Sequence, residues 1–414
     1  MRILLVTRLF TGFETSLNRL IWEPEGLPTI YKLVERLDKD NELFFFLLAK
    51  DSGKTYTSGW KEKKDLTRRL KGLKAKVYVF AGINFFSNII PKKLAMILRD
   101  FRHLLKITFY IYRKKPDIIY CDSSNVVIAA ILKLIYPKIP LVLRVLGICS
   151  FLRSLLYTKK IIHRIYRLAF KSNFSAVIGT QEGSGIEIWF EKALRHDVKK
   201  YILLNGVDQN KTNIETIRKY SGIKKKFDKK ILILFIGRLE EYKGIRIFLS
   251  LALNLLEKFN TRVAFLIVGD GSMYDFVKTS VNNSNYKNSF ELLRNVPHSE
   301  VMQIHKISDI YISTNKDGNL SNANLEAINS NDCMLIPKPR KSENIDIKTY
   351  SLLKDSVVYY ELEDIEELME KVKFLILHPN EIKKMKLKVS KRKSKFIRSW
   401  KERIKEEEDI LLNL

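Results

Sequence analysis

Apolar runs with the length of β-strands alternate with longer, helix-like segments along most of the chain. This alternation is typical of parallel sheets covered by helices. Two of the runs are almost uniformly apolar, as expected for parallel strands that are buried on both faces. A chain of 414 residues also exceeds what one hydrophobic core usually serves. The sequence therefore predicts an α/β protein of two domains.

The predicted strands form two series, separated by a change in composition. The first series is RILLVT, ELFFFLLA, AKVYVFAG, DIIYCDS, PLVLRVLG and SAVIGT, and the second is ILILFIG, RVAFLIVGDG, FELLRNV, DIYIST, CMLIP and SVVYYE. The charged stretch 209–229 between them has no apolar face and is predicted to be a linker. We expect domains over residues 1–208 and 230–394, with the carboxyl edges of both parallel sheets facing an inter-domain cleft.

The formal net charge is +28, from 74 Lys and Arg against 46 Asp and Glu. This excess indicates an anionic partner, either lipid headgroups or nucleic acid. The alternative is a Lys-rich compositional bias that places cations over the whole surface. The three cysteines show no disulfide framework or zinc spacing, which fits a reducing compartment. The start MRILLVTRLF is typical of a strand rather than a signal peptide, and no run reaches the roughly 18 apolar residues of a spanning helix. We predict a cytoplasmic protein that touches a membrane from outside.

The second series opens with FIGRLEEYKGI, which contains Gly237, Arg238 and Lys243. A glycine at a strand end allows a sharp turn, so both cations are expected at the carboxyl edge of the sheet near a helix N-terminus. Free N–H groups and the helix dipole favour a phosphate there, and an Arg with a Lys suits a diphosphate. The alternative is two solvated charges in a turn. Gly269, in LIVGDGSM, either admits a nucleotide or makes a plain turn.

The order of motifs resembles the retaining GT-B glycosyltransferases of family four. A strand ending in G-R-L-x-x-x-K-G is followed by V-G-D-G, by a V-P-H-x-E-V helix and by L-E-A. In the first half, PDIIYCDSS, IPLVLRVLG and ILLNGVD are similar to the family's amino-terminal domain. The resemblance runs from MRILLVT to Trp400. It implies two Rossmann-like domains and a final helix, residues 395–414, that crosses back to the first domain.

The resemblance also implies roles for the donor site. Arg238 and Lys243 would bind the diphosphate of a nucleotide-sugar and stabilise the leaving group. Glu326, on the predicted first turn of a helix behind a loop of small polar residues, would accept hydrogen bonds from both ribose hydroxyls. Neither a general base nor a metal or other cofactor is implied. The remaining donor-binding candidates are Asn322, Ala323, Asp317, Gly318, Gly237, Gly269 and Gly26.

Two positions depart from the family pattern. The family has a second Glu eight residues before the first, where this chain has Gly318 with Asp317 beside it. The family also often has a His before the glycine that ends the fourth amino-terminal strand, where this chain has Leu146 with Arg144 nearby. Both missing groups touch the sugar rather than the nucleotide. The identity of the donor sugar is therefore open, and Asp317 is a candidate to replace the missing carboxylate.

Two basic, amphipathic stretches lie in the amino-terminal domain. Residues 91–115 and 151–171 carry apolar residues at helical spacing, among many Lys and Arg. One interpretation is two ordinary core-facing helices with solvated cations. The other is a pair of interfacial helices that reach a lipid-linked acceptor at an anionic membrane, joined by the basic tail 383–405. The candidate acceptor or membrane residues are Arg102, Lys106, Arg164 and Arg167.

These features together predict a GT-B enzyme that transfers a hexosyl or related sugar from a nucleotide-diphosphate donor, with retention. The expected acceptor is a glycan or lipid-linked glycan in envelope polysaccharide or glycoconjugate synthesis. Two alternatives remain. One is a basic nucleic-acid-binding protein, against which stands the lack of any specific nucleic-acid-binding motif. The other is a catalytically silent GT-B scaffold module, suggested by Gly318 and Leu146.

Overall fold

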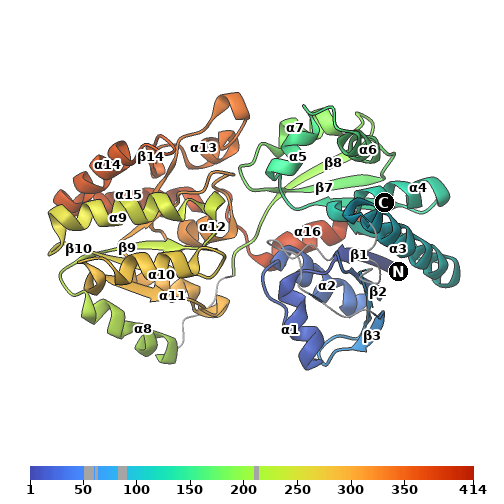
Figure 1. Cartoon of the computed structure of the whole chain (residues 1–414), viewed down its shortest axis with the longest axis horizontal. Coiled ribbons are helices and arrows are strands. Elements are labelled where there is room, and N and C mark those ends of the chain that lie inside the picture. Colours follow the sequence, from blue (N-terminus) through green and yellow to red (C-terminus); the bar gives the residue numbers. More distant parts are fainter. Residues whose placement is uncertain (51–59, 61–63, 83–90, 209–213) are drawn as a thin grey trace. The chain divides into compact units, whose positions relative to one another are not determined.

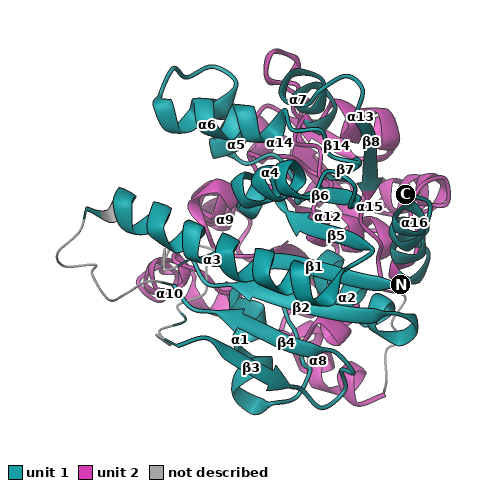
Figure 2. Ribbon diagram, turned by 90° about the vertical axis from the view of Figure 1, so that its right-hand side faces the viewer, with its two compact units in different colours: residues 1–180, 186–203, 401–414 teal, residues 181–185, 204–400 magenta. Residues whose placement is uncertain are grey.

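The chain forms two compact units, coloured separately in Figure 2. Unit 1 comprises residues 1–180, 186–203 and 401–414, and unit 2 comprises residues 181–185 and 204–400. The structure, a computed structural model, describes residues 1–50, 60, 64–82, 91–208 and 214–414. Each unit is built around one sheet (Figure 1).

In the described part of unit 1 the sheet has the strand order β3-β4-β2-β1-β5-β6-β7-β8. Strand β3 pairs antiparallel with β4, and the pairs from β4 through to β7 run parallel. The bounds are β1 Arg2–Arg8, β2 Glu42–Leu48, β3 Leu66–Arg69, β4 Lys76–Phe80, β5 Ile118–Asp122, β6 Leu141–Val145, β7 Ala176–Gln181 and β8 Lys199–Leu204.

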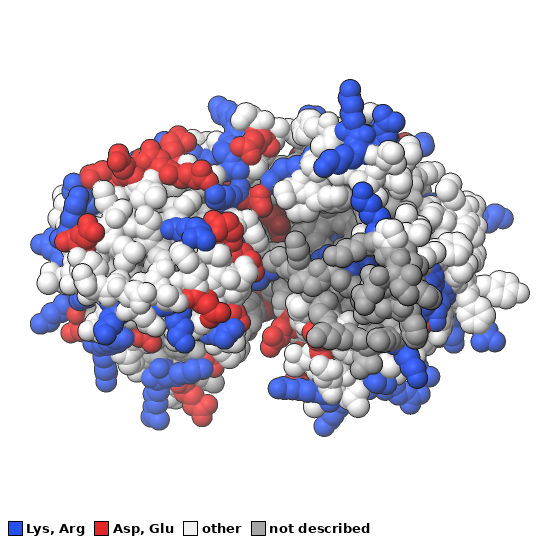
Figure 3. Space-filling view, viewed as in Figure 1, with Lys and Arg blue, Asp and Glu red and all other residues white. Residues whose placement is uncertain are grey.

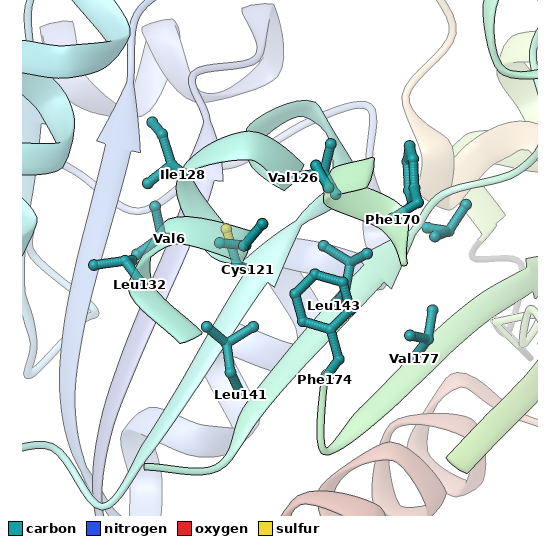
Figure 4. Close-up of a cluster of buried hydrophobic side chains, with 14 of the residues drawn as sticks. Val6, Cys121, Val126, Ile128, Leu132, Leu141, Leu143, Phe170, Phe174 and Val177 are labelled. Atoms are coloured by element: carbon teal, nitrogen blue, oxygen red, sulfur yellow. The ribbon is translucent and has the colours of Figure 1, made fainter. Parts of the chain in front are cut away.

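Helices cover both faces of this sheet. Helix α2 illustrates the cause: Pro28 starts it, and Leu33, Val34 and Leu37 recur at helical spacing and are fully buried. On the opposite face, side chains of β1, β5, β6 and β7 meet those of α4 and the end of α6 (Figure 4). The helices are α1 Thr11–Arg19, α2 Pro28–Asp40, α3 Lys92–Lys114, α4 Val126–Ile135, α5 Ser150–Leu155, α6 Ile161–Phe170, α7 Ile186–Ala193 and α16 Trp400–Leu412.

A buried ionic cluster binds α16 to the sheet of unit 1. Glu407 of α16 lies 3.1 Å from Arg144 Nε of β6 and 2.7 Å from Arg403 Nη2, and it accepts a hydrogen bond from the hydroxyl of Tyr120 in β5. Arg144 also donates to Thr180 Oγ1. Burial raises the pKa of Glu407, but the two guanidinium groups together lower it by a larger amount. The net pKa therefore lies below its usual range. Arg144 therefore faces α16, and Leu146 follows the end of β6.

Unit 2 has an all-parallel sheet in the order β11-β10-β9-β12-β13-β14 over the described residues. Alternate residues of β10 point to opposite faces, so Phe265 packs with α9 and α14 while Leu266 packs with α11 and α12. The bounds are β9 Ile231–Ile236, β10 Val263–Val268, β11 Phe290–Leu293, β12 Ile310–Ile312, β13 Cys333–Pro337, β14 Val358–Tyr360, α8 Ile214–Lys226, α9 Ile245–Phe259, α10 Tyr274–Asn282, α11 Val301–Ile307, α12 Asn322–Asn329, α13 Ile347–Leu353, α14 Ile365–Leu377 and α15 Pro379–Lys393.

The predicted boundaries need correction at the linker. Residues 214–226 of the stretch expected to be a linker form helix α8, which belongs to unit 2 and packs beside α11. Its apolar face is small, because Tyr220 is buried while Ile217 is exposed, and the periodicity is correspondingly weak. Residues 209–213 lie outside the described residues. The helix α16 belongs to unit 1, and segment 181–185 belongs to unit 2.

Candidate active site

Two cations follow the first strand of unit 2. Gly237 follows β9, Arg238 comes next, and a short 3₁₀ turn over Glu241–Lys243 precedes α9. Arg238 Nη2 donates to the hydroxyl of Tyr242 at 2.5 Å, and Lys243 Nζ lies 5.4 Å from the centroid of the Tyr242 ring. The tyrosine thus sits beside both cations.

The turn that carries Lys243 packs against the loop that leads to α12. Gly244 has φ of +71°, and a Cβ there would lie 2.2 Å from the carbonyl oxygen of Thr314. Only glycine permits this approach. Thr314 Oγ1 donates to the Lys243 carbonyl at 2.8 Å, and the Lys316 N–H donates to the Tyr242 carbonyl at 3.2 Å. The two motifs predicted to bind one donor are therefore adjacent in unit 2.

Burial changes the charge equilibrium of both cations. Desolvation lowers the pKa of Lys243 to about 8, although the carboxylates of Glu182 and Asp317 act in the opposite direction. Desolvation also lowers the pKa of Arg238. A cation with few water partners gains more from an anionic ligand than a fully hydrated one does. The site is suited to a phosphate group.

Buried amides hold the loop between β12 and α12. Asn319 donates from Nδ2 to Asp346 Oδ2 at 2.7 Å and accepts from Ser313 Oγ at 2.7 Å. Asn324 accepts from the Tyr311 hydroxyl at 2.7 Å and donates to the Asn319 carbonyl at 3.1 Å. These side chains are almost fully buried and hydrogen-bonded. The abundance of asparagine in this stretch therefore fixes the loop's conformation.

Glu326 is the fifth residue of α12, so it lies on the second turn of the helix. The sequence-based expectation that it lies on the first turn is wrong. Its Oε1 lies 3.5 Å from Nδ1 of His298, whose Nε2 lies 3.3 Å from Oδ2 of Asp208. Burial raises the pKa of Glu326, which His298 partly opposes. Three motifs that are distant in sequence thus meet here, and His298, when protonated, favours the ionised form of Glu326.

The other donor-site candidates lie as follows. Asn322 and Ala323 open α12, and Asn322 Oδ1 accepts from Asn205 Nδ2 at 2.7 Å. Gly269 follows β10, and its N–H donates to the Leu293 carbonyl at 2.9 Å. Gly26 lies between α1 and α2 in unit 1, with φ of +89°. Helix α1, which was not predicted, lies between β1 and Gly26.

Three of the four predicted acceptor or membrane cations make contacts within unit 1. Arg102 and Lys106 of α3 both pair with Asp65, and Arg167 donates to the carbonyls of Leu155 and Thr158 at 2.6 and 2.7 Å. Arg164 is exposed on α6. The first three cations therefore stabilise local structure, whatever else they bind.

The apolar residues of α3 divide between two faces. Leu104, Ile107 and Ile111 pack into the core of unit 1. Six other apolar residues of the stretch 91–115, which also recur at helical spacing, are 40–63% exposed. The interpretation of this face as core-facing is therefore wrong. These six residues are Leu94, Ile97, Leu98, Phe101, Leu105 and Phe109.

Helix α6 adds two more exposed apolar residues, Ile161 and Leu168, which are 77% and 72% exposed.

Figure 3 shows Lys and Arg on the visible face of both units, with Asp and Glu between them on unit 2. Several cations of the basic tail bind protein groups, for example Lys393 to the Asn329 carbonyl and Arg403 to Glu407. Among the described residues, no helix combines the length and apolar character required to cross a bilayer.

Three residues of the candidate site were not predicted from the sequence. His298 and Tyr242 lie inside the quoted motifs V-P-H-x-E-V and G-R-L-x-x-x-K-G, so the motifs themselves were the available signal. Glu182 lies after β7, more than a hundred residues before α12, and no local pattern connects it to Lys243.

Family comparison locates a match in unit 2. The family model described as glycosyl transferases group 1 matches residues 216–388. An uncharacterized glycosyltransferase of Methanocaldococcus jannaschii is 28% identical over 177 residues, which are 40% of this chain and 45% of that protein. The match thus spans less than half of that relative.

Several solved structures share this fold. Sucrose-phosphate synthase from Thermosynechococcus elongatus has a TM-score of 0.72 at 10% identity, over 100% of this chain and 99% of that chain. Alr3699/HepE of Anabaena in complex with UDP-glucose has a TM-score of 0.66 at 15% identity, over all of both chains. A UDP-forming α,α-trehalose-phosphate synthase from Burkholderia vietnamiensis scores 0.64 at 12% identity, over 96% and 95%.

The predicted fold class is confirmed: two Rossmann-like units with parallel sheets, as in GT-B glycosyltransferases. Together the comparisons support a glycosyltransferase, and the match to glycosyl transferases group 1 falls in the unit that contains Arg238, Lys243 and Glu326.

Proposed function

We propose that this protein transfers a hexosyl or related sugar from a nucleotide-diphosphate donor to a glycan or lipid-linked acceptor, with retention of configuration. The observation that supports this most directly is the packing of the Arg238–Lys243 turn against the loop in front of Glu326. Partly desolvated cations suit a diphosphate, and a buried carboxylate suits the vicinal hydroxyls of a ribose.

Arg238 and Lys243 would stabilise the charge that develops on the departing diphosphate. Their partial burial strengthens this interaction, because fewer water molecules screen it. Glu326 would orient the nucleotide by accepting hydrogen bonds from the ribose, held in place by His298. The mechanism assigns no step to a metal or other cofactor.

The donor is tested first with bare nucleotides. HepE and a trehalose-6-phosphate enzyme have been solved with UDP or a UDP-sugar, so UDP is the first probe and GDP and ADP follow. A rise in melting temperature with one diphosphate supports the proposed donor site, and release of that diphosphate from its sugar nucleotide in the presence of acceptor supports transfer. No response to any of the three would refute the donor assignment.

Glu326→Gln is expected to weaken binding of that nucleotide about ten- to a hundredfold, because a charged hydrogen bond contributes about 1.5–3 kcal/mol. Titration calorimetry measures the two dissociation constants. The matching 2′-deoxy nucleotide is the control: the parent should bind it less well than the ribonucleotide, and the variant should discriminate far less. If Glu326→Gln binds both nucleotides as the parent does, Glu326 does not contact the ribose.

The acceptor side of the proposal places α3 and α6 at an anionic membrane, where envelope glycan precursors are attached to lipid. The exposed apolar residues of α3 can enter the headgroup region, and Lys93, Arg113 and Arg164 are exposed cations on the same two helices. Each basic residue near an anionic surface adds about 1 kcal/mol. Contiguous exposed apolar side chains of this kind mark interaction surfaces.

We expect the protein to sediment with vesicles that contain phosphatidylglycerol and to be released by salt, but not to sediment with phosphatidylcholine vesicles. The double variant Ile97→Asp with Phe101→Asp should lose this binding. The matched control is Leu377→Asp, which changes an exposed leucine on α14 of unit 2 and should bind as the parent does. Equal sedimentation with both kinds of vesicle would attribute the net charge to composition alone.

A further inference from the structure

Segment 181–185, which follows β7, docks on the candidate site through its backbone. The Leu320 N–H donates to the Glu182 carbonyl at 3.0 Å, and the Asp346 N–H donates to the Gly183 carbonyl at 2.7 Å. Both acceptors belong to the segment, and both donors belong to the part of unit 2 that surrounds the loop before α12. The segment is therefore fixed beside this loop by contacts that do not involve the side chain of Glu182.

This docking explains the glycine at position 318. Gly318 has φ of +121°, and a Cβ there would lie 2.4 Å from the carbonyl oxygen of Glu182. A side chain at 318 would collide with backbone as well as strain its own conformation. Position 318 therefore cannot hold a residue with a carboxylate while segment 181–185 is docked in this place.

The side chain of Glu182 acts on the two residues that line the cationic turn. Burial has the largest effect on the pKa of Lys243 and lowers it, whereas the carboxylate of Glu182 raises it, by more than Asp317 does. The same carboxylate acts on Tyr242. Glu182 is partly exposed.

We propose that Glu182 supplies the carboxylate that contacts the donor sugar, in the position left without a side chain at Gly318. This inference rests on the proposed function. A hexose attached to a diphosphate on Arg238 and Lys243 would present its hydroxyls to groups beside Lys243, and a carboxylate accepts hydrogen bonds from such hydroxyls. Glu182 then determines which sugar is accepted.

The test compares Glu182→Gln with Asp317→Asn, using UDP and UDP-glucose as probes. Glu182→Gln should weaken UDP-glucose binding about tenfold or more, because it loses a charged hydrogen bond. Binding of bare UDP should stay within about threefold or become tighter, since a negative charge near the diphosphate is removed. Asp317→Asn should leave unchanged the ratio of the dissociation constant for UDP-glucose to that for UDP.

Glu182→Asp is the conservative control and should restore part of the preference for the sugar-bearing nucleotide. Because the docking contacts use backbone atoms, all three variants should melt within a few degrees of the parent. An unchanged ratio in Glu182→Gln overturns this inference, and a raised ratio in Asp317→Asn alone assigns the contact to Asp317. A parent that binds neither UDP nor UDP-glucose, nor their GDP and ADP counterparts, would instead refute the proposed function itself.

Discussion

Replacing Arg238 or Lys243 by alanine is expected to slow sugar transfer about 10²- to 10³-fold, the range found when a preorganised group that stabilises developing charge is removed. Both side chains are only partly buried, so the fold should survive. Initial rates of nucleotide release measure the effect. Arg246→Ala is the matched control, because Arg246 is an exposed cation on the next helical turn that pairs with Glu241.

The pH dependence separates the two cations. With a pKa of about 8 in the free protein, Lys243 is charged below pH 8 and loses its charge as the pH rises through that value. Affinity for a diphosphate should therefore fall above pH 8, by up to about tenfold per pH unit. Lys243→Arg should abolish this decline, because arginine stays protonated. If both alanine variants keep turnover within a few-fold of the parent, the diphosphate does not bind at this turn.

The strands were predictable because their burial leaves a direct trace in composition. Every predicted apolar run contains a strand of one of the two sheets. Strands β3 and β8 were missed, and both are edge strands in which most residues stay at least partly exposed. An edge strand packs against fewer neighbours, so its sequence needs fewer apolar residues.

The orientation of α3 could not be predicted from periodicity. The helix has apolar residues on two faces, and the pattern does not reveal which face meets the sheet. Contacts of Ile107 and Ile111 with the core decide it. The candidate site divides similarly: Arg238, Lys243 and Glu326 lie in local motifs, whereas the pairing of His298 with Glu326 and the docking of segment 181–185 depend on the tertiary fold.

Arg144 shows why a sequence neighbour is a weak guide to a site. It lies two residues from the position where the family often has a histidine, but its side chain is fully buried and points to α16. In a strand, successive side chains face opposite sides of the sheet, and Arg144 and Leu146 share one parity. The chain ends its strand at Val145, however, so that parity does not extend to Leu146.

Glu407→Ala is expected to destabilise unit 1 by about 3–5 kcal/mol, because it leaves the buried guanidinium groups of Arg144 and Arg403 without their shared carboxylate. Urea unfolding followed by tryptophan fluorescence measures the loss, since Trp22 and Trp189 lie in unit 1. Asp409→Ala, an exposed acidic residue on the same helix, is the control and should change stability by less than about 0.5 kcal/mol.

The same cluster predicts how unit 1 responds to acid. The pKa of Glu407 is lower in the folded protein than in the unfolded chain, so its ionic contribution is complete above the unfolded value and is lost as the pH falls through the folded one. Glu407→Gln should therefore lose stability at neutral pH and show a shallower loss on acidification than the parent. If both Glu407 variants unfold at the parent's urea midpoint, this cluster does not hold α16 on the sheet, and the apolar contacts of Ile404 and Leu411 must do so.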